Sequence, residues 1–151
     1  MTRDSQKQKV YDWENAVIAP LSKGGVPFDQ AQAFVDGVWL SHGWLYPPQV
    51  SMMPKQATAT MATGCRAEIR VRSTTPDWVI LHELAHTLTA NEDGQGGRYN
   101  DGHGADFVGI YIKLLERVLN IPTLMTMYTL KQAKVKFNLG AQPWMQRRNQ
   151  P

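Results

Sequence analysis

Two histidines and a glutamate are spaced in a way that suits metal chemistry. His82 and His86 are four residues apart in the segment His82-Glu83-Leu84-Ala85-His86. Four residues of an α-helix turn through roughly 400°, so both imidazoles would project from nearly the same side and reach one metal ion. Glu83 would lie about 100° around the helix from His82, where it can reach a water molecule on the metal without being a ligand. This H-E-x-x-H pattern predicts two histidine ligands, with Glu83 as the general base.

A catalytic zinc ion takes three protein ligands and keeps one position for water, so a third ligand is needed. The chain has four histidines, and His103 is the one that follows the glycine-rich stretch after this segment. A loop of that length can fold back, so we predict His103 as the third ligand and Zn2+ as the metal. Asp93, Asp101 and Asp106 are alternative oxygen ligands, and Asp106 could instead orient a histidine from behind. His42, the remaining histidine, is expected to be structural.

The elements that must position these residues are helices and a small sheet. Apolar residues recur at three- and four-residue steps, which predicts helices over residues 4–18, 29–41, 76–90, 104–119 and 122–137. Strict alternation of apolar and charged residues predicts a strand over 67–72, and residues 49–53 and 57–63 are weaker strand candidates. About three such strands would form a small, mostly antiparallel sheet. The order of helices, strands and helices indicates an α+β domain.

Length, cysteine content and charge limit the class of protein. The 151 residues suit one domain over 1–151, with residues 140–151 expected to form a loosely ordered tail. Cys65 is the single cysteine, so no internal disulfide can form, and a reducing compartment fits. No apolar run has the length of a signal peptide or a membrane span, so we expect a cytoplasmic protein without a membrane partner. The net charge of +3 permits contact with nucleic acid without requiring it. The oligomeric state stays open.

Three segments are notable when taken together: Arg3-Asp4-Ser5-Gln6 through Val10-Tyr11-Asp12-Trp13-Glu14, then His82 to His86, then His103-Gly104-Ala105-Asp106-Phe107. Over residues 3–130 the chain resembles a family of metallohydrolases from actinobacteria and their phages. The paired HELAH and HGxxF segments are also similar to those of SprT-like zinc proteases. The resemblance implies a zincin-like fold, zinc held by His82, His86 and His103, and Glu83 as the base. SprT-like proteins often add a four-cysteine zinc ribbon with DNA-linked roles, which a chain with one cysteine cannot form.

The function expected from these residues is zinc-dependent hydrolysis of a peptide or protein substrate. Glu83 would take the proton of the attacking water, and Tyr99 or Arg98 is a candidate for an additional donor. An extended peptide could add to a strand edge at 57–63 or 68–72, and the glycine-rich loop could act as a lid. Two alternatives are a zinc-stabilised, non-catalytic module that binds protein or nucleic acid, and a hydrolase of cell-wall peptide bonds. A purely structural zinc site needs no base beside it, which favours the hydrolase.

Overall fold

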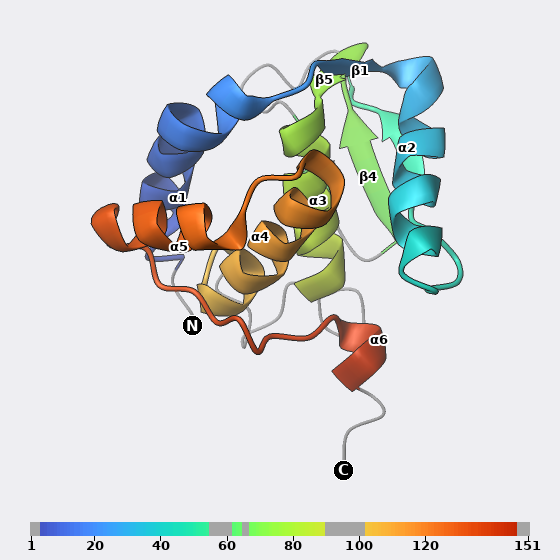
Figure 1. Cartoon of the computed structure of the whole chain (residues 1–151). Coiled ribbons are helices and arrows are strands. Elements are labelled where there is room, and N and C mark those ends of the chain that lie inside the picture. Colours follow the sequence, from blue (N-terminus) through green and yellow to red (C-terminus); the bar gives the residue numbers. More distant parts are fainter. Residues whose placement is uncertain (1–3, 55–61, 65–66, 90–101, 148–151) are drawn as a thin grey trace.

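The computed structural model describes residues 4–54, 62–64, 67–89 and 102–147. Within them, helices surround a small sheet (Figure 1). The elements in chain order are α1 (Lys7–Trp13), the π-helical turn η1 (Glu14–Ile18), the 3₁₀ turn η2 (Ala19–Leu21), β1 (Gly25–Pro27), α2 (Phe28–Ser41), β2 (Gln49–Met52), β3 (Thr63–Gly64), β4 (Glu68–Val71), β5 (Thr74–Pro76), α3 (Asp77–Thr89), α4 (Ala105–Leu119), α5 (Thr123–Gln132) and α6 (Trp144–Arg147). This mixture confirms the predicted α+β class.

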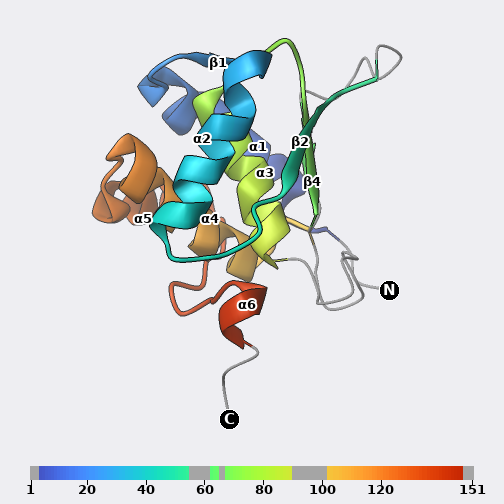
Figure 2. The same ribbon diagram turned by 90° about the vertical axis from the view of Figure 1, so that its right-hand side faces the viewer.

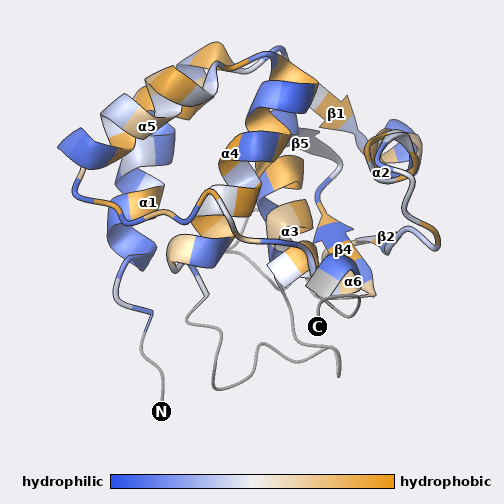
Figure 3. Cartoon of the chain, turned by 60° about the horizontal axis from the view of Figure 1, so that its bottom comes forward, coloured by the Kyte–Doolittle hydropathy of each residue, from blue (hydrophilic) through white to orange (hydrophobic). Residues whose placement is uncertain are grey.

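Helix α3 lies at the centre of the fold. It packs against α4 on one side and against β3 and β4 on the other. Figure 2 shows the sheet edge-on, with α2 and α3 on the same side of it. Figure 3 shows that α3 and α4 are largely hydrophobic, whereas α1 is largely hydrophilic. The helix that carries His82 and His86 is therefore held in place by packing on two sides.

The strand predicted over 67–72 is confirmed as β4. Ile69 and Val71 are buried and Arg70 is exposed, so one face of the strand contacts the helices. The three-stranded sheet has the order β2-β4-β3. The expectation of a mostly antiparallel sheet needs correction here, because β2 runs parallel to β4 and only β3 is antiparallel to it. The other edge of β2 is covered by a side chain: Gln32 of α2 accepts a hydrogen bond from Val50 N at 2.8 Å.

Strands β1 and β5 and helix α6 were not predicted from the sequence. β1 and β5 pair as an antiparallel ribbon, in which Val26 lies opposite Thr75. The tail expected to be loosely ordered contains α6, and Ala141 and Pro143 before it are buried. Residues 148–151 lie outside the described residues, as do Cys65 and Tyr99. No helix in the described part of the chain combines the length and apolar character needed to cross a bilayer.

The last long helix, α5, ends five residues before the predicted limit at 137. Lys134 has a positive φ of 60°, and Val135 N bonds to Leu130 O at 2.9 Å. Lys134 N also bonds to Lys131 O at 3.1 Å. This is the hydrogen-bond pattern of a Schellman motif, which glycine usually closes. A lysine at the left-handed position gives no sequence signal, so the helix end was not predicted.

Gly109 of α4 is expected to be essential for the packing of the segment after α5. A Cβ atom added at Gly109 would lie 1.8 Å from the backbone oxygen of Asn138, whose N–H bonds to Ala105 O. Replacing Gly109 with alanine should therefore lower the free energy of unfolding by about 1–3 kcal/mol or more. Gly37 of α2 is the matched control, because nothing lies within 4 Å of its added Cβ.

For Gly37→Ala we expect a gain of about 0.5–1 kcal/mol, since alanine is the better helix former. Urea denaturation of both variants measures the difference. Equal effects of the two substitutions would contradict the close approach of Asn138 to α4.

Candidate metal centre

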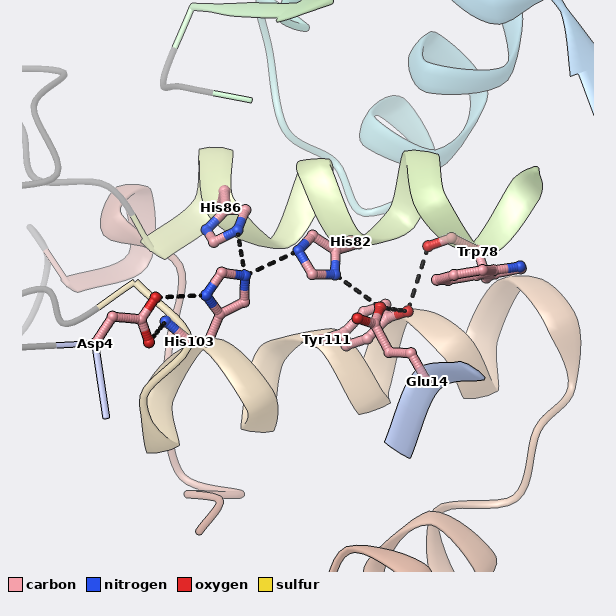
Figure 4. Close-up of polar contacts among 7 residues, drawn as sticks. All are labelled: Asp4, Glu14, Trp78, His82, His86, His103 and Tyr111. Carbon is pink, nitrogen blue, oxygen red and sulfur yellow. Dashed lines mark hydrogen bonds and ion pairs between the residues drawn. The ribbon is translucent and has the colours of Figure 1, made fainter. Parts of the chain in front are cut away.

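Three histidines from two parts of the chain meet between α3 and α4 (Figure 4). His82 and His86 project from α3, and His103 lies just before α4. His103 Nε2 is 3.1 Å from His82 Nε2 and 3.2 Å from His86 Nε2. The ligand atoms of the three residues all lie within 4.8 Å of one another. The predicted group of His82, His86 and His103 is therefore present as a cluster that could bind a metal ion.

The helix that carries two of these histidines is fixed at its start and along its apolar side. The Asp77 carboxylate at the start of α3 accepts hydrogen bonds from Trp78 N, Lys23 N and the Ser22 hydroxyl. Such a carboxylate satisfies free N–H groups and complements the positive end of the helix. The apolar side consists of Ile80, Leu84 and Leu88, each at most 1% exposed. The two imidazoles therefore project from a helix with little freedom to move.

Two carboxylates from the N-terminal segment hold two of the imidazoles from behind. Glu14 Oε2 lies 2.7 Å from His82 Nδ1 and accepts a second hydrogen bond, also at 2.7 Å, from the Tyr111 hydroxyl. Asp4 Oδ2 lies 2.7 Å from His103 Nδ1. A carboxylate at Nδ1 favours the tautomer that carries its proton there, which leaves Nε2 with a free lone pair. Both rings are thereby set to act as ligands through Nε2.

This arrangement fits a bound cation. With those tautomers, the lone pairs of His82 and His103 face each other across 3.1 Å, which is unfavourable unless positive charge lies between them. Zinc–nitrogen bonds of 2.0–2.1 Å at tetrahedral angles place two ligand nitrogens about 3.3–3.4 Å apart. The separations of 3.1 and 3.2 Å are close to that value. Three imidazoles are also a ligand set that catalytic zinc sites use.

Burial sets the charge states around the cluster. Burial lowers the pKa of His82 to about 3 and that of His86 well below its usual value, so both rings are neutral and able to bind a metal. Burial raises the pKa of Glu14 to about 7, against the effect of the Tyr111 hydrogen bond. The same cause, with a contribution from Glu14, raises the pKa of Glu83 to about 8. A cation at the histidines would favour the charged form of both carboxylates.

Aromatic rings surround the imidazoles. The Phe107 ring of α4 is 1% exposed and packs against all three, with centroid distances of 4.4 Å to His86 and 5.0 Å to His82 and to His103. Tyr11 of α1 meets the His103 ring edge-on at 5.1 Å. Burial raises the pKa of Tyr11, and the nearby charge of Glu83 adds to the effect. The two rings therefore restrict the orientation of the ligands and keep water from part of the cluster.

The remaining predicted site residues lie elsewhere. Asp106 does not orient a histidine: it is exposed on α4 and accepts a hydrogen bond from Asn138 Nδ2 at 2.9 Å. Orienting a histidine from behind was one of the possible roles of Asp106, and at His103 Asp4 has that role instead. His42 directly follows α2, where its ring stacks on Trp44 with centroids 4.3 Å apart, as expected for a structural histidine. Tyr99 lies outside the described residues, as do the other candidates of the glycine-rich loop, Asp93, Arg98 and Asp101.

Asp4, Tyr11, Glu14 and Tyr111 had no predicted role. The one available signal was the resemblance of the N-terminal segment, which contains the first three of them. Comparison of the chain with protein-family models, with curated proteins and with solved structures finds no match.

Proposed function

We propose that the protein is a zinc-dependent hydrolase that cleaves peptide or amide bonds, with His82, His86 and His103 as the ligands of zinc. The observation that carries the proposal is the convergence of three Nε2 atoms, with His103 Nε2 at 3.1 and 3.2 Å from the other two. The residue that follows His82 on α3 is Glu83, which is also buried. A site with a purely structural metal needs no such carboxylate beside it. We further propose that the α+β fold is zincin-like, which the position of α3 against a small sheet supports.

Glu83 is the general base of the proposed reaction. Zinc, when bound, supplies the Lewis acidity that lowers the pKa of water and polarises the carbonyl group. Glu83 accepts a proton from water as the water oxygen forms a bond to the carbonyl carbon. The same carboxyl group then passes that proton to the amine nitrogen as the C–N bond breaks. A pKa raised by burial suits this double role, because the group must both take and release a proton near neutral pH.

The sheet limits where an extended peptide substrate can bind. β4 is paired on both sides, with β2 and β3, so the predicted addition of a peptide at 68–72 is wrong. In the described part of the sheet, β3 is an edge strand and it contacts α3. It includes Thr63, the last residue of the other predicted position, whereas residues 57–61 are outside the described part. We therefore propose the edge of β3 as the place where the substrate backbone would pair.

The test is cleavage of a diverse peptide library by the zinc-loaded protein, with the products identified by mass spectrometry. We expect cuts at peptide bonds that disappear with the chelator 1,10-phenanthroline and return when zinc is added. Elemental analysis should find about one zinc ion per chain, as a single three-histidine site requires. Full zinc occupancy without any cut would reject the peptidase and favour the non-catalytic binding module.

A further inference from the structure

The third histidine of the cluster is held in a different way from the other two. His82 and His86 belong to one helix, so their spacing is set by the backbone of α3. His103 lies before α4, whose first residue is Ala105. Outside a helix, a residue needs other contacts to keep its side chain at the position of a ligand. The contacts of His103 therefore decide whether the site has two ligands or three.

Asp4 and Gln6 together bind the backbone and the outer ring nitrogen of His103. Asp4 Oδ2 lies 2.7 Å from His103 Nδ1, and Asp4 Oδ1 accepts a hydrogen bond from His103 N at 3.3 Å. Gln6 Nε2 donates to His103 O at 3.0 Å. The backbone N–H, the backbone carbonyl and Nδ1 are thus all occupied. The one remaining polar atom, Nε2, faces His82 and His86.

The two residues are themselves fixed in place. Gln6 is 7% exposed, and its side-chain amide pairs with the backbone of Lys136, donating to the carbonyl and accepting from the N–H. The Asp4 side chain lies against Gly102, which has a positive φ of 77°. A Cβ atom at Gly102 would lie 2.6 Å from Asp4 Oδ2, so the carboxylate occupies space that a larger residue would fill. The N-terminal segment therefore fits closely around His103.

We propose that Asp4 and Gln6 form an N-terminal clamp that positions His103 as the third metal ligand, so that residues 4–6 belong to the metal centre. This inference rests on the proposed zinc site. Asp4 holds the ring through a short, charge-assisted hydrogen bond, and Gln6 holds the backbone. Groups of this kind behind a ligand typically change metal affinity by about 10–100-fold. Binding of the metal and docking of the N-terminal segment are then linked events.

The experiment compares the metal affinity of Asp4→Ala and Asp4→Asn with that of the wild-type protein by competition with a chelator. We expect Asp4→Ala to bind Zn2+ about 10–100-fold more weakly, and Asp4→Asn to show an intermediate loss because its oxygen can still accept from Nδ1. The matched control is Asp12→Ala, because Asp12 is exposed on α1 and bonds to Gln8. It should bind Zn2+ as tightly as the wild type. The Asp4 side chain is 28% exposed, so its variants are expected to fold.

Two further measurements separate positioning from general stability. The visible spectrum of Co2+ in Asp4→Ala should shift towards that of His103→Ala, since both variants lose the ordered third ligand. In the zinc-free protein, long-range 1H–15N NMR should find the His103 proton on Nδ1 in the wild type and redistributed in Asp4→Ala. Wild-type protein that binds neither zinc nor cobalt would overturn the metal site and the clamp with it. Wild-type binding with an unchanged Asp4→Ala would overturn the clamp alone.

Discussion

Replacing Glu83 with glutamine is expected to leave zinc bound and to lower the rate of peptide hydrolysis by about 10²–10⁴-fold. Glutamine has the shape of glutamate but cannot accept the proton of the attacking water. Glu83 is 6% exposed and lies on α3 next to His82, so a residue of equal size should preserve the packing and the metal ligands. Zinc content by elemental analysis and cleavage rates by mass spectrometry, measured on the same sample, test both parts.

Glu68→Gln is the matched control for this substitution. Glu68 lies on β4 and forms an ion pair with Arg70 at 2.6 Å, in which both side chains are well exposed. An exposed pair of this kind contributes at most about 1 kcal/mol, so neither folding nor hydrolysis should change noticeably. Undiminished hydrolysis by Glu83→Gln would remove Glu83 as the base. Loss of zinc from that variant would instead indicate that Glu83 helps to hold the metal.

The parts of the site that the sequence predicted are those encoded by local spacing. The positions of His82, Glu83 and His86 follow from the helical period, and the apolar residues on the opposite side of α3 made that helix predictable. The role of His103 as third ligand could also be predicted, because zinc favours histidine and the chain has only two other histidines besides His82 and His86, one of them His103 itself. The elements nearest the site, α3 and α4, accordingly begin and end close to the predicted limits.

The carboxylates behind the histidines could not be predicted in the same way. Glu14 is 68 residues from His82, and Asp4 is 99 residues from His103. In the sequence, both look like ordinary charged residues of an N-terminal helix. Glu14 is in fact 2% exposed, at the start of the π-helical turn that follows α1. Turns of this type often occur at functional sites, but nothing in the local sequence marks one here.

The pairing of the strands was also only partly predictable from the sequence. Alternation identified β4 because its burial pattern is a property of the strand itself. The parallel partner β2 and the β1–β5 ribbon depend on which distant segments pair, and hydrogen bonds between backbones carry little residue preference. Gly25 and Pro27 lie between the helices predicted over 4–18 and 29–41, where no strand was predicted, yet they begin and end β1. The pairing of strands that are far apart in the sequence therefore became evident only from the structure.

Replacing His103 with alanine is expected to weaken zinc binding sharply and to remove most of the stabilisation that zinc provides. Zinc at about 1,000 times its dissociation constant should stabilise the wild-type protein by about 4 kcal/mol. For a domain of this size, that corresponds to a rise in Tm of roughly 8–16 °C. Without the third Nε2, two histidines of α3 remain, so added zinc should raise the Tm of His103→Ala only slightly.

The matched control is His42→Ala, which removes a histidine that stacks on Trp44 and takes no part in the described cluster. It should lose some stability with and without zinc, and the zinc-dependent rise in Tm should stay the same. His103→Ala should instead lose the zinc-dependent rise in Tm. In the zinc-free protein, the loss of stability caused by this substitution is partly offset, because the lone pairs of His82 and His103 no longer face each other across 3.1 Å. The destabilisation of His103→Ala relative to the wild type should therefore be largest in the presence of zinc. A full zinc-dependent rise in Tm for His103→Ala would show that another residue completes the ligand set.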